Sequence, residues 1–143
     1  MEKTYEEISS NVDALLIIDG DELDSEAMRN QKIFSTINRY YVQKSRELEF
    51  LSNGLAKVEQ TRFRHYAGKE TALHYKTNPL SEAILKSDIP GHMSVDPIVV
   101  EMRGLVKECE RIVKYLEESK GSLRSRSFDI RNAIDYRKMM TGG

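Results

Sequence analysis

The stretch FSTINRYYVQKSRELEFLSNGLAKVEQTR, residues 34–62, decides the fold of this chain. Apolar and a few charged side chains recur in it at alternating spacings of three and four residues. These seam positions are Phe34, Ile37, Tyr41, Lys44, Leu48, Leu51, Leu55, Val58 and Arg62. The repeat predicts a coiled-coil-like helix, which we expect over residues 21–68. Ser52-Asn53-Gly54 could form a turn, but the repeat keeps its phase through it, so we expect one helix with a locally destabilised turn.

A second repeat of the same kind predicts a C-terminal helix over residues 97–141, opened by Asp96-Pro97. Its seam positions are Ile98, Met102, Leu105, Cys109, Ile112, Leu116, Ser119, Leu123, Arg126, Ile130, Ala133, Arg137 and Met140. A side stripe of Val99, Val106 and Val113 widens the apolar face of its first half.

The rest of the chain has weaker signals. Thr4 followed by Glu7 is a capping box, which predicts a short helix over residues 5–16 within an acidic N-terminal segment, 1–20. Residues 69–96 lose the repeat, so we expect a long connecting segment there. Within it, Pro79 could start a helical turn or two, and residues 86–94 are expected to form a loop.

These elements predict an all-α protein, a single helical domain over 1–143. Each long helix would measure about 65 Å at 1.5 Å per residue. A compact domain of this length has a radius of gyration of only about 14–15 Å. We therefore expect an elongated chain that covers its remaining apolar seam by homo-oligomerisation.

Charge is distributed unevenly although the formal net charge is only -1. Residues 1–30 carry nine acidic residues against Lys3 and Arg29, a balance of -7, which leaves +6 for the remainder. An acidic head on a basic body suggests a nucleic-acid partner for the body. With Cys109 as the single cysteine, intrachain disulfides and thiolate zinc clusters are excluded. No long apolar run or leader is present, so we expect a cytoplasmic protein with no membrane partner.

Catalytic patterns are absent from the sequence. His65, His74 and His92 lack metal-ligand spacing and are expected on surface loops or helix ends. We find no triad and no paired carboxylates, and the segment around Gly68-Lys69 lacks the earlier glycine of a phosphate loop. We therefore expect no enzyme, no metal and no cofactor.

Two basic stretches laced with apolar side chains remain, at residues 57–69 and 120–138. Repeated positive charge beside exposed rings can neutralise phosphates and stack bases, although a solvated helix face gives the same pattern. Arg62, Arg126 and Arg137 occupy seam positions. Charges there could control register, form an ion pair at an oligomer interface, or contact a ligand.

Two blocks carry a family resemblance: Arg62-Phe-Arg-His-Tyr-Ala-Gly68 and Leu123-Arg-Ser-Arg-Ser-Phe-Asp-Ile-Arg131. From about Asp19 to the C-terminus the chain resembles the UvsY family, the recombination mediators of T-even-like bacteriophages. The resemblance implies a ring-forming, heptameric protein that binds single-stranded DNA without sequence preference in the host cytoplasm. It also implies two protein partners, a RecA-like phage recombinase and the phage single-strand-binding protein.

The resemblance also implies site residues. The family's basic DNA-contact position carries over to Arg62, whereas a second one is Gln60 here, whose charge Lys57 and Arg64 could replace. With Tyr66 and Lys69 from the same stretch, these residues form the predicted DNA-binding set.

The C-terminal block is tied to assembly in the family. The predicted assembly set is Leu116, Leu123, Arg126, Phe128, Ile130 and Ile134. The competing hypothesis is a structural coiled-coil adaptor that binds only proteins, for which the cluster around Arg62 would be needless.

Overall fold

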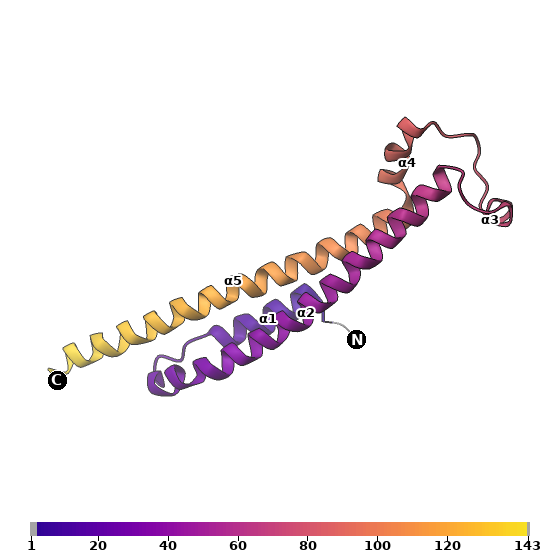
Figure 1. The fold of residues 1–143 in the computed structure, drawn as a ribbon. Coiled ribbons are helices and arrows are strands. Elements are labelled where there is room, and N and C mark those ends of the chain that lie inside the picture. The colour runs from indigo at the N-terminus through magenta and orange to yellow at the C-terminus, as the bar shows by residue number, and fades with distance from the viewer. Residues whose placement is uncertain (1–2, 143) are drawn as a thin grey trace. The chain divides into compact units, whose positions relative to one another are not determined.

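Helices are the regular elements of residues 3–142, the part of the chain that the computed structural model describes (Figure 1). Their order is α1 Tyr5–Leu16, α2 Leu23–Tyr66, α3 Ala72–Thr77, the 3-10 turn η1 Lys86–Asp88, α4 Ile89–Val95 and α5 Pro97–Met140. The all-α prediction with two long heptad helices is confirmed. Helix α2 continues through Gly54, so the sequence Ser52-Asn53-Gly54 does not interrupt it.

The chain forms two compact units. Unit 1 comprises Met1–Arg46 and Glu110–Gly143, and unit 2 comprises Glu47–Cys109. Helices α2 and α5 each contribute one part to both units, whereas α1 belongs to unit 1 and α3, η1 and α4 belong to unit 2.

Unit 1 is built around a core that three helices share. The buried members of this core are Ile8 and Val12 of α1, Ile33 and Ile37 of α2, and Ile112, Leu116 and Leu123 of α5. Branched aliphatic side chains at three-and-four spacing place one apolar stripe of each helix toward the others. Helix α1, within the acidic N-terminal segment, therefore contributes to the core of unit 1.

Helix α1 begins as the sequence predicts. The Thr4 hydroxyl accepts from the Glu7 amide at 3.3 Å, and the Glu7 carboxylate accepts from the Thr4 amide at 3.1 Å, which completes the capping box. Further along α1, the Asp13 carboxylate accepts a hydrogen bond from the Tyr115 hydroxyl of α5 at 2.6 Å. Burial together with this hydrogen bond raises the pKa of Tyr115 to about 12.

Arg126 is the most enclosed cation of unit 1, with its side chain only 2% exposed. Its guanidinium donates to the Leu16 carbonyl at 3.3 Å, to the Glu26 carbonyl at 3.0 Å, and to the side chains of Asn30 and Glu26. One arginine of α5 thus binds the end of α1 and the first turns of α2 together. Its positive charge is matched inside the chain by Glu26.

In unit 2, the middle of α2 packs closely on the start of α5. A Cβ atom added at Gly54 would lie 3.1 Å from the Cε atom of Met102. The glycine therefore gives the flexible end of Met102 room beside the helix backbone.

The seam of α5 differs from the predicted one over its first three turns. Val99 is fully buried and Val106 nearly so, whereas Ile98 and Leu105 are about half exposed. Val99, Met102, Val106 and Cys109 also alternate at three and four residues, so two adjacent apolar rows compete and spacing does not choose between them. Phe34 of α2 is likewise exposed, and its neighbour Ile33 is buried instead.

The connecting segment holds more helix than predicted. Residues 86–94, expected as a loop, form η1 and most of α4, while the turn expected after Pro79 does not form. Pro90 lies in the first turn of α4, where its missing amide hydrogen costs no hydrogen bond. Buried Ile89 attaches this short helix to the unit, a tertiary contact that local patterning does not predict. No helix in residues 3–142 is long and apolar enough to cross a membrane.

Candidate nucleic-acid interface

The predicted DNA-binding residues lie at the C-terminal end of α2, in unit 2. Gly68 has a positive φ of 71°, the left-handed conformation that ends many helices. The Lys69 amide donates back to the Arg64 carbonyl at 3.0 Å, and the Arg64 guanidinium donates to the Lys69 carbonyl at 2.8 Å and to Glu70 at 3.0 Å. These hydrogen bonds join the last turn of α2 to the residues that follow it.

Asp96 is the hub of this region. Its Oδ2 atom accepts from the Arg62 Nε at 2.8 Å and from the Tyr66 hydroxyl at 2.6 Å. Its Oδ1 atom accepts from the amides of Ile98 and Val99 at 2.9 and 3.1 Å, so it also caps α5. One buried carboxylate therefore ties the end of α2 to the start of α5.

The pKa values of this group reflect the same contacts. Burial alone would raise the pKa of Asp96, but the hydrogen bonds from Tyr66, the Val99 amide and Arg62 hold it below its ordinary value. Burial and the bond to Asp96 raise the pKa of Tyr66. Burial opposes the charge of Arg62, yet Tyr66 and Asp96 raise its pKa. The cluster thus holds a charged carboxylate, a charged guanidinium and a neutral phenol.

The predicted set divides between two faces of α2. Lys57 and Arg64 are seven residues apart, which places them on one outward face, and both are exposed. Arg62 and Tyr66, one turn apart, face Asp96, and the guanidinium lies 5.3 Å from the centre of the Tyr66 ring. The Arg62 side chain is 18% exposed, whereas that of Arg64 is 49% exposed. Lys69 follows the helix and is exposed.

Rings surround the end of α2. His65 is buried, and its Nδ1 lies 2.8 Å from the Nε2 of His74 in α3. The Tyr75 hydroxyl donates to the His65 carbonyl at 2.8 Å, and Tyr66 stacks on His92 of α4. Burial, followed by the charge of Arg62, lowers the pKa of His65. His65 thus lies at a helix end, which is one of the two expected locations, but it is buried there.

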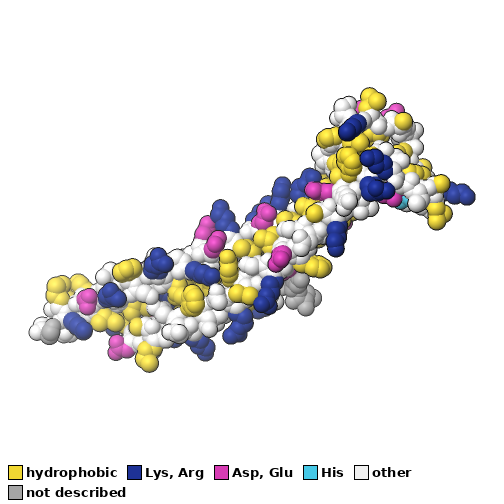
Figure 2. Space-filling model, in the orientation of Figure 1, with side chains coloured by type: hydrophobic (Ala, Val, Ile, Leu, Met, Phe, Trp, Pro, Cys, Tyr) yellow, Lys and Arg dark blue, Asp and Glu magenta, His cyan; other side chains and the backbone are white. Residues whose placement is uncertain are grey.

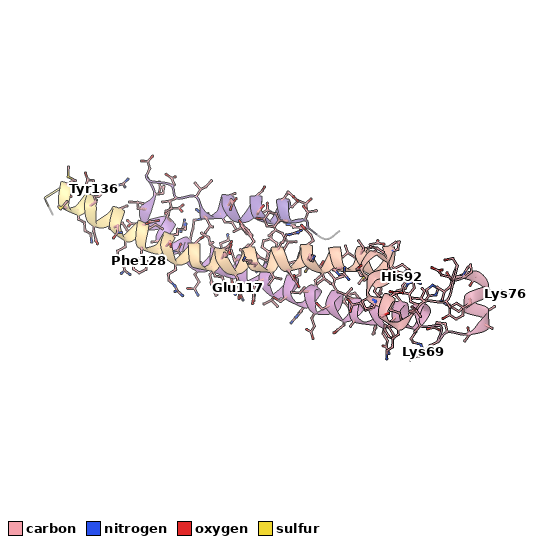
Figure 3. All side chains as sticks on the ribbon, turned by 90° about the horizontal axis from the view of Figure 1, so that it is seen from above. Lys69, Lys76, His92, Glu117, Phe128 and Tyr136 are labelled. Atoms are coloured by element: carbon pink, nitrogen blue, oxygen red, sulfur yellow. The ribbon has the colours of Figure 1, made fainter. Side chains whose placement is uncertain are left out.

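Exposed cations gather around this cluster. Figure 2 shows Lys and Arg side chains over the part of the chain that carries α3 and α4. In Figure 3, Lys69 and Lys76 lie at the α3 end of unit 2, and His92 lies on α4. Sequence reasoning missed Asp96 as the partner of Arg62, because 34 residues separate them and no local pattern links them.

The predicted assembly set is divided as well. Leu116 and Leu123 belong to the core of unit 1, and Ile130 and Arg126 are also buried within the chain. Ile134 is partly buried and lines a groove with residues 21–24. Phe128 is different, because it is 55% exposed and projects from α5 (Figure 3), with Arg131 5.8 Å from its ring centre.

The described residues offer no metal centre. Within residues 3–142, no three His, Cys, Asp or Glu side chains are grouped as metal ligands. Cys109 is buried on the seam of α5 and is not part of a disulfide.

Exposed cations and aromatic rings lie together at the C-terminal end of α2, an arrangement that suits a protein that binds nucleic acid. The family model described as "Recombination, repair and ssDNA binding protein UvsY" matches residues 11–143. The chain therefore belongs to the UvsY family, as its two sequence blocks indicated. The family is described by recombination, repair and single-stranded DNA binding, and not by a catalysed reaction.

Solved structures agree with this assignment. Crystal structures of the recombination mediator protein UvsY of bacteriophage T4 resemble the chain with TM-scores of 0.84, 0.82 and 0.81. Sequence identity is 16–17%, and the alignments cover 92–98% of this chain and 97–99% of those chains. The likeness at this identity establishes the shared fold. No curated protein matches the sequence.

Proposed function

We propose that this protein is a non-enzymatic recombination mediator that binds single-stranded DNA without sequence preference. In this role it promotes loading of a RecA-like phage recombinase onto DNA covered by the phage single-strand-binding protein. The observation that carries the proposal is membership of the UvsY family over residues 11–143. The exposed cations and rings at the end of α2 support it, because charge and stacking surface suit a strand of any sequence.

The proposed mechanism is multivalent. Each chain offers a weak basic patch made of Lys57, Arg62, Arg64, Tyr66 and Lys69. A homo-oligomeric ring, a heptamer by the resemblance, would repeat that patch and hold one strand with high avidity. Phe128 supports the assembly part of the proposal, since an aromatic ring exposed on a single chain gains by burial against a neighbour.

The first test is fluorescence anisotropy with a labelled oligonucleotide over a salt series. A mediator binds single-stranded DNA with an affinity that falls steeply as salt rises, whereas a protein-only adaptor shows no affinity at moderate salt. A second assay adds the protein to recombinase and DNA coated with single-strand-binding protein. Faster onset of the recombinase's DNA-dependent ATP hydrolysis supports loading, and an unchanged lag contradicts it.

Matched variants test whether the first basic stretch binds DNA and the second mediates assembly. Lys57→Gln with Lys69→Gln removes two exposed cations and leaves the bonds of Asp96 untouched. It should lower the salt slope by about 1.4 for each chain in contact with the strand, since each phosphate contact on a single strand contributes about 0.7. Its mass by sedimentation velocity should remain that of the wild type.

Phe128→Ala should give the opposite pattern. The change should lower the mass of the assembly in sedimentation velocity and leave the stability of the chain within about 0.5 kcal/mol, because the ring is exposed. DNA affinity should then fall through lost multivalency. An unchanged mass for Phe128→Ala, or a dissociated oligomer for the lysine variant, would show that the roles are reversed.

A further inference from the structure

A row of cations runs along the outward face of α2 within unit 1. Its members are Lys32, Arg39 and Arg46, which we call the α2 row, and all three are exposed. They are spaced seven residues apart, so successive members lie two helical turns and about 10.5 Å from each other on nearly the same line. The buried residues of this part of α2, Ile33 and Ile37, lie on another face, toward the core.

Acidic residues are absent from most of the sequence that carries the α2 row, and the first ones after it are Glu47 and Glu49. Residues 27–46 contain five cations and no Asp or Glu. Two of the five are used elsewhere: Arg29 pairs with Glu26 at 2.5 Å, and Lys44 is buried with an internal partner. The three that remain are those of the row, and Figure 2 shows Lys and Arg side chains along the edge that α2 forms.

An ordinary solvated helix face has a different pattern. Exposed helices of soluble proteins usually alternate the signs of their charges, since oppositely charged pairs at spacings of three or four residues stabilise them. Lys32 and Arg39 have no acidic residue three or four positions away, whereas Arg46 has Glu49 three positions on. A regular line of like charges that is mostly without oppositely charged neighbours on its own helix is suited to a partner that carries a regular line of opposite charges.

We propose that the α2 row is a second contact surface for the sugar–phosphate backbone of single-stranded DNA, separate from the basic end of α2 in unit 2. This inference rests on the proposed function. It commits to a nucleic acid and not to an acidic protein, because protein interfaces are depleted of charge at their centre and rely on large apolar or aromatic anchors. The apolar side chains of residues 27–46 near the row's face are Met28, which precedes Lys32, and Val42, which lies between Arg39 and Arg46.

The test is the salt dependence of DNA binding by the triple variant Lys32→Gln, Arg39→Gln, Arg46→Gln. Glutamine matches lysine and arginine in helix propensity, so α2 should keep its structure. The variant should bind a labelled oligonucleotide more weakly. Its salt slope should be lower by about 2 for each chain in contact with the strand, at about 0.7 per phosphate contact.

The matched control changes the same number of charges on another helix. Lys107→Gln, Lys114→Gln, Arg124→Gln removes three exposed cations from α5. It should change the slope by less than a third as much. Thermal melts followed by circular dichroism should overlay for both triple variants and the wild type.

Three outcomes would overturn the inference or its basis, and they can be told apart. An α2-row variant with a wild-type slope, beside a lowered slope for Lys57→Gln with Lys69→Gln, removes the second surface and leaves the proposed function standing. An equal loss in the α5 control assigns the effect to net charge and overturns the assignment to this row. A wild-type protein without salt-dependent binding overturns the proposed function itself.

Discussion

Two arginines occupy seam positions of the long helices, one in each unit, and they differ in how far their side chains are buried. In unit 1, the Arg126 guanidinium is enclosed and directs its donors to acceptors from α1 and α2. In unit 2, Arg62 is fixed through Nε to Asp96 but keeps part of its side chain at the surface. Burial lowers the pKa of Arg126, whereas the pKa of Arg62 is raised despite burial. A charge on a heptad seam can therefore serve structure alone, or serve structure and remain available to a ligand.

The largest effect is expected where the charge is most enclosed. Arg126→Ala breaks the buried pair with Glu26, leaves that carboxylate with Arg29 as its ionic partner, and removes the donor to the Leu16 carbonyl. It should lower the free energy of unfolding by about 3–5 kcal/mol. Urea denaturation followed by circular dichroism measures the loss. The double change Arg126→Met with Glu26→Leu should recover most of it, because an apolar pair of similar volume removes the desolvation cost. A loss below about 1 kcal/mol for Arg126→Ala would contradict the role of Arg126 in joining the end of α1 to the first turns of α2.

The corresponding change in unit 2 should cost less. Asp96→Ala removes the cap of α5, worth about 1 kcal/mol, and leaves the Tyr66 hydroxyl and Arg62 without their acceptor. We expect a total loss of about 2–3 kcal/mol by urea denaturation. Asp96→Asn should lose less, since an amide oxygen can still cap the helix.

Acid titration separates the charge of Asp96 from its capping. Its folded-state pKa lies below the ordinary value of 3.8, so the stability it contributes is complete above that pH. The contribution is lost as the pH falls through the lower folded-state value. The difference in stability between the wild type and Asp96→Asn should therefore shrink below pH 3.8, and a constant difference would argue against a charged carboxylate.

Tyr115 supplies a test at the opposite end of the pH scale, in unit 1. Its pKa is raised from 10.0 to about 12, so the unfolded chain loses this proton first as the pH rises. Stability is complete below pH 10 and declines between pH 10 and about 12. Tyr115→Phe should cost about 1 kcal/mol at pH 8 through the lost bond to Asp13. The cost should become smaller at pH 11, where a cost that stays constant would contradict the shift.

The smallest effect concerns the packing of unit 2. Gly54→Ala should raise the free energy of unfolding by about 0.5–1 kcal/mol, because alanine is the better helix former. The new methyl group meets only the flexible end of Met102, which can move. Gly54→Val is the contrasting variant, since its branched side chain should clash and destabilise the unit. A destabilising alanine would mean that α2 and α5 are packed too tightly in unit 2 to adjust.

The sequence predicts the parts of this fold that local physics determines. The two long helices follow from the heptads, and the α1 start follows from Thr4 and Glu7. The buried face at the start of α5 was not predictable, because two adjacent apolar rows have the same spacing. Burial of Val99 in preference to Ile98 depends on partners elsewhere in the chain. Helix α4 was not predictable for the same reason, since a seven-residue helix depends on tertiary contacts such as that of Ile89.

The candidate site was predictable as a stretch and not as an arrangement. Basic residues and rings in residues 57–69 indicated a nucleic-acid contact, and all of them lie at one end of α2. The internal bond of Arg62 to Asp96 was not predictable, because it joins residues far apart in the sequence. The α2 row could have been predicted from a stretch of twenty residues that contains no Asp or Glu. It is less evident than the apolar seam, which lies in the same residues.

The contact between His65 and His74 couples the hydrogen positions of two helices. The two facing nitrogens lie 2.8 Å apart, a distance that requires one hydrogen between them and a lone pair on the other side. The tautomer of one ring therefore determines that of the other, so the end of α2 and helix α3 share one hydrogen-bonding state.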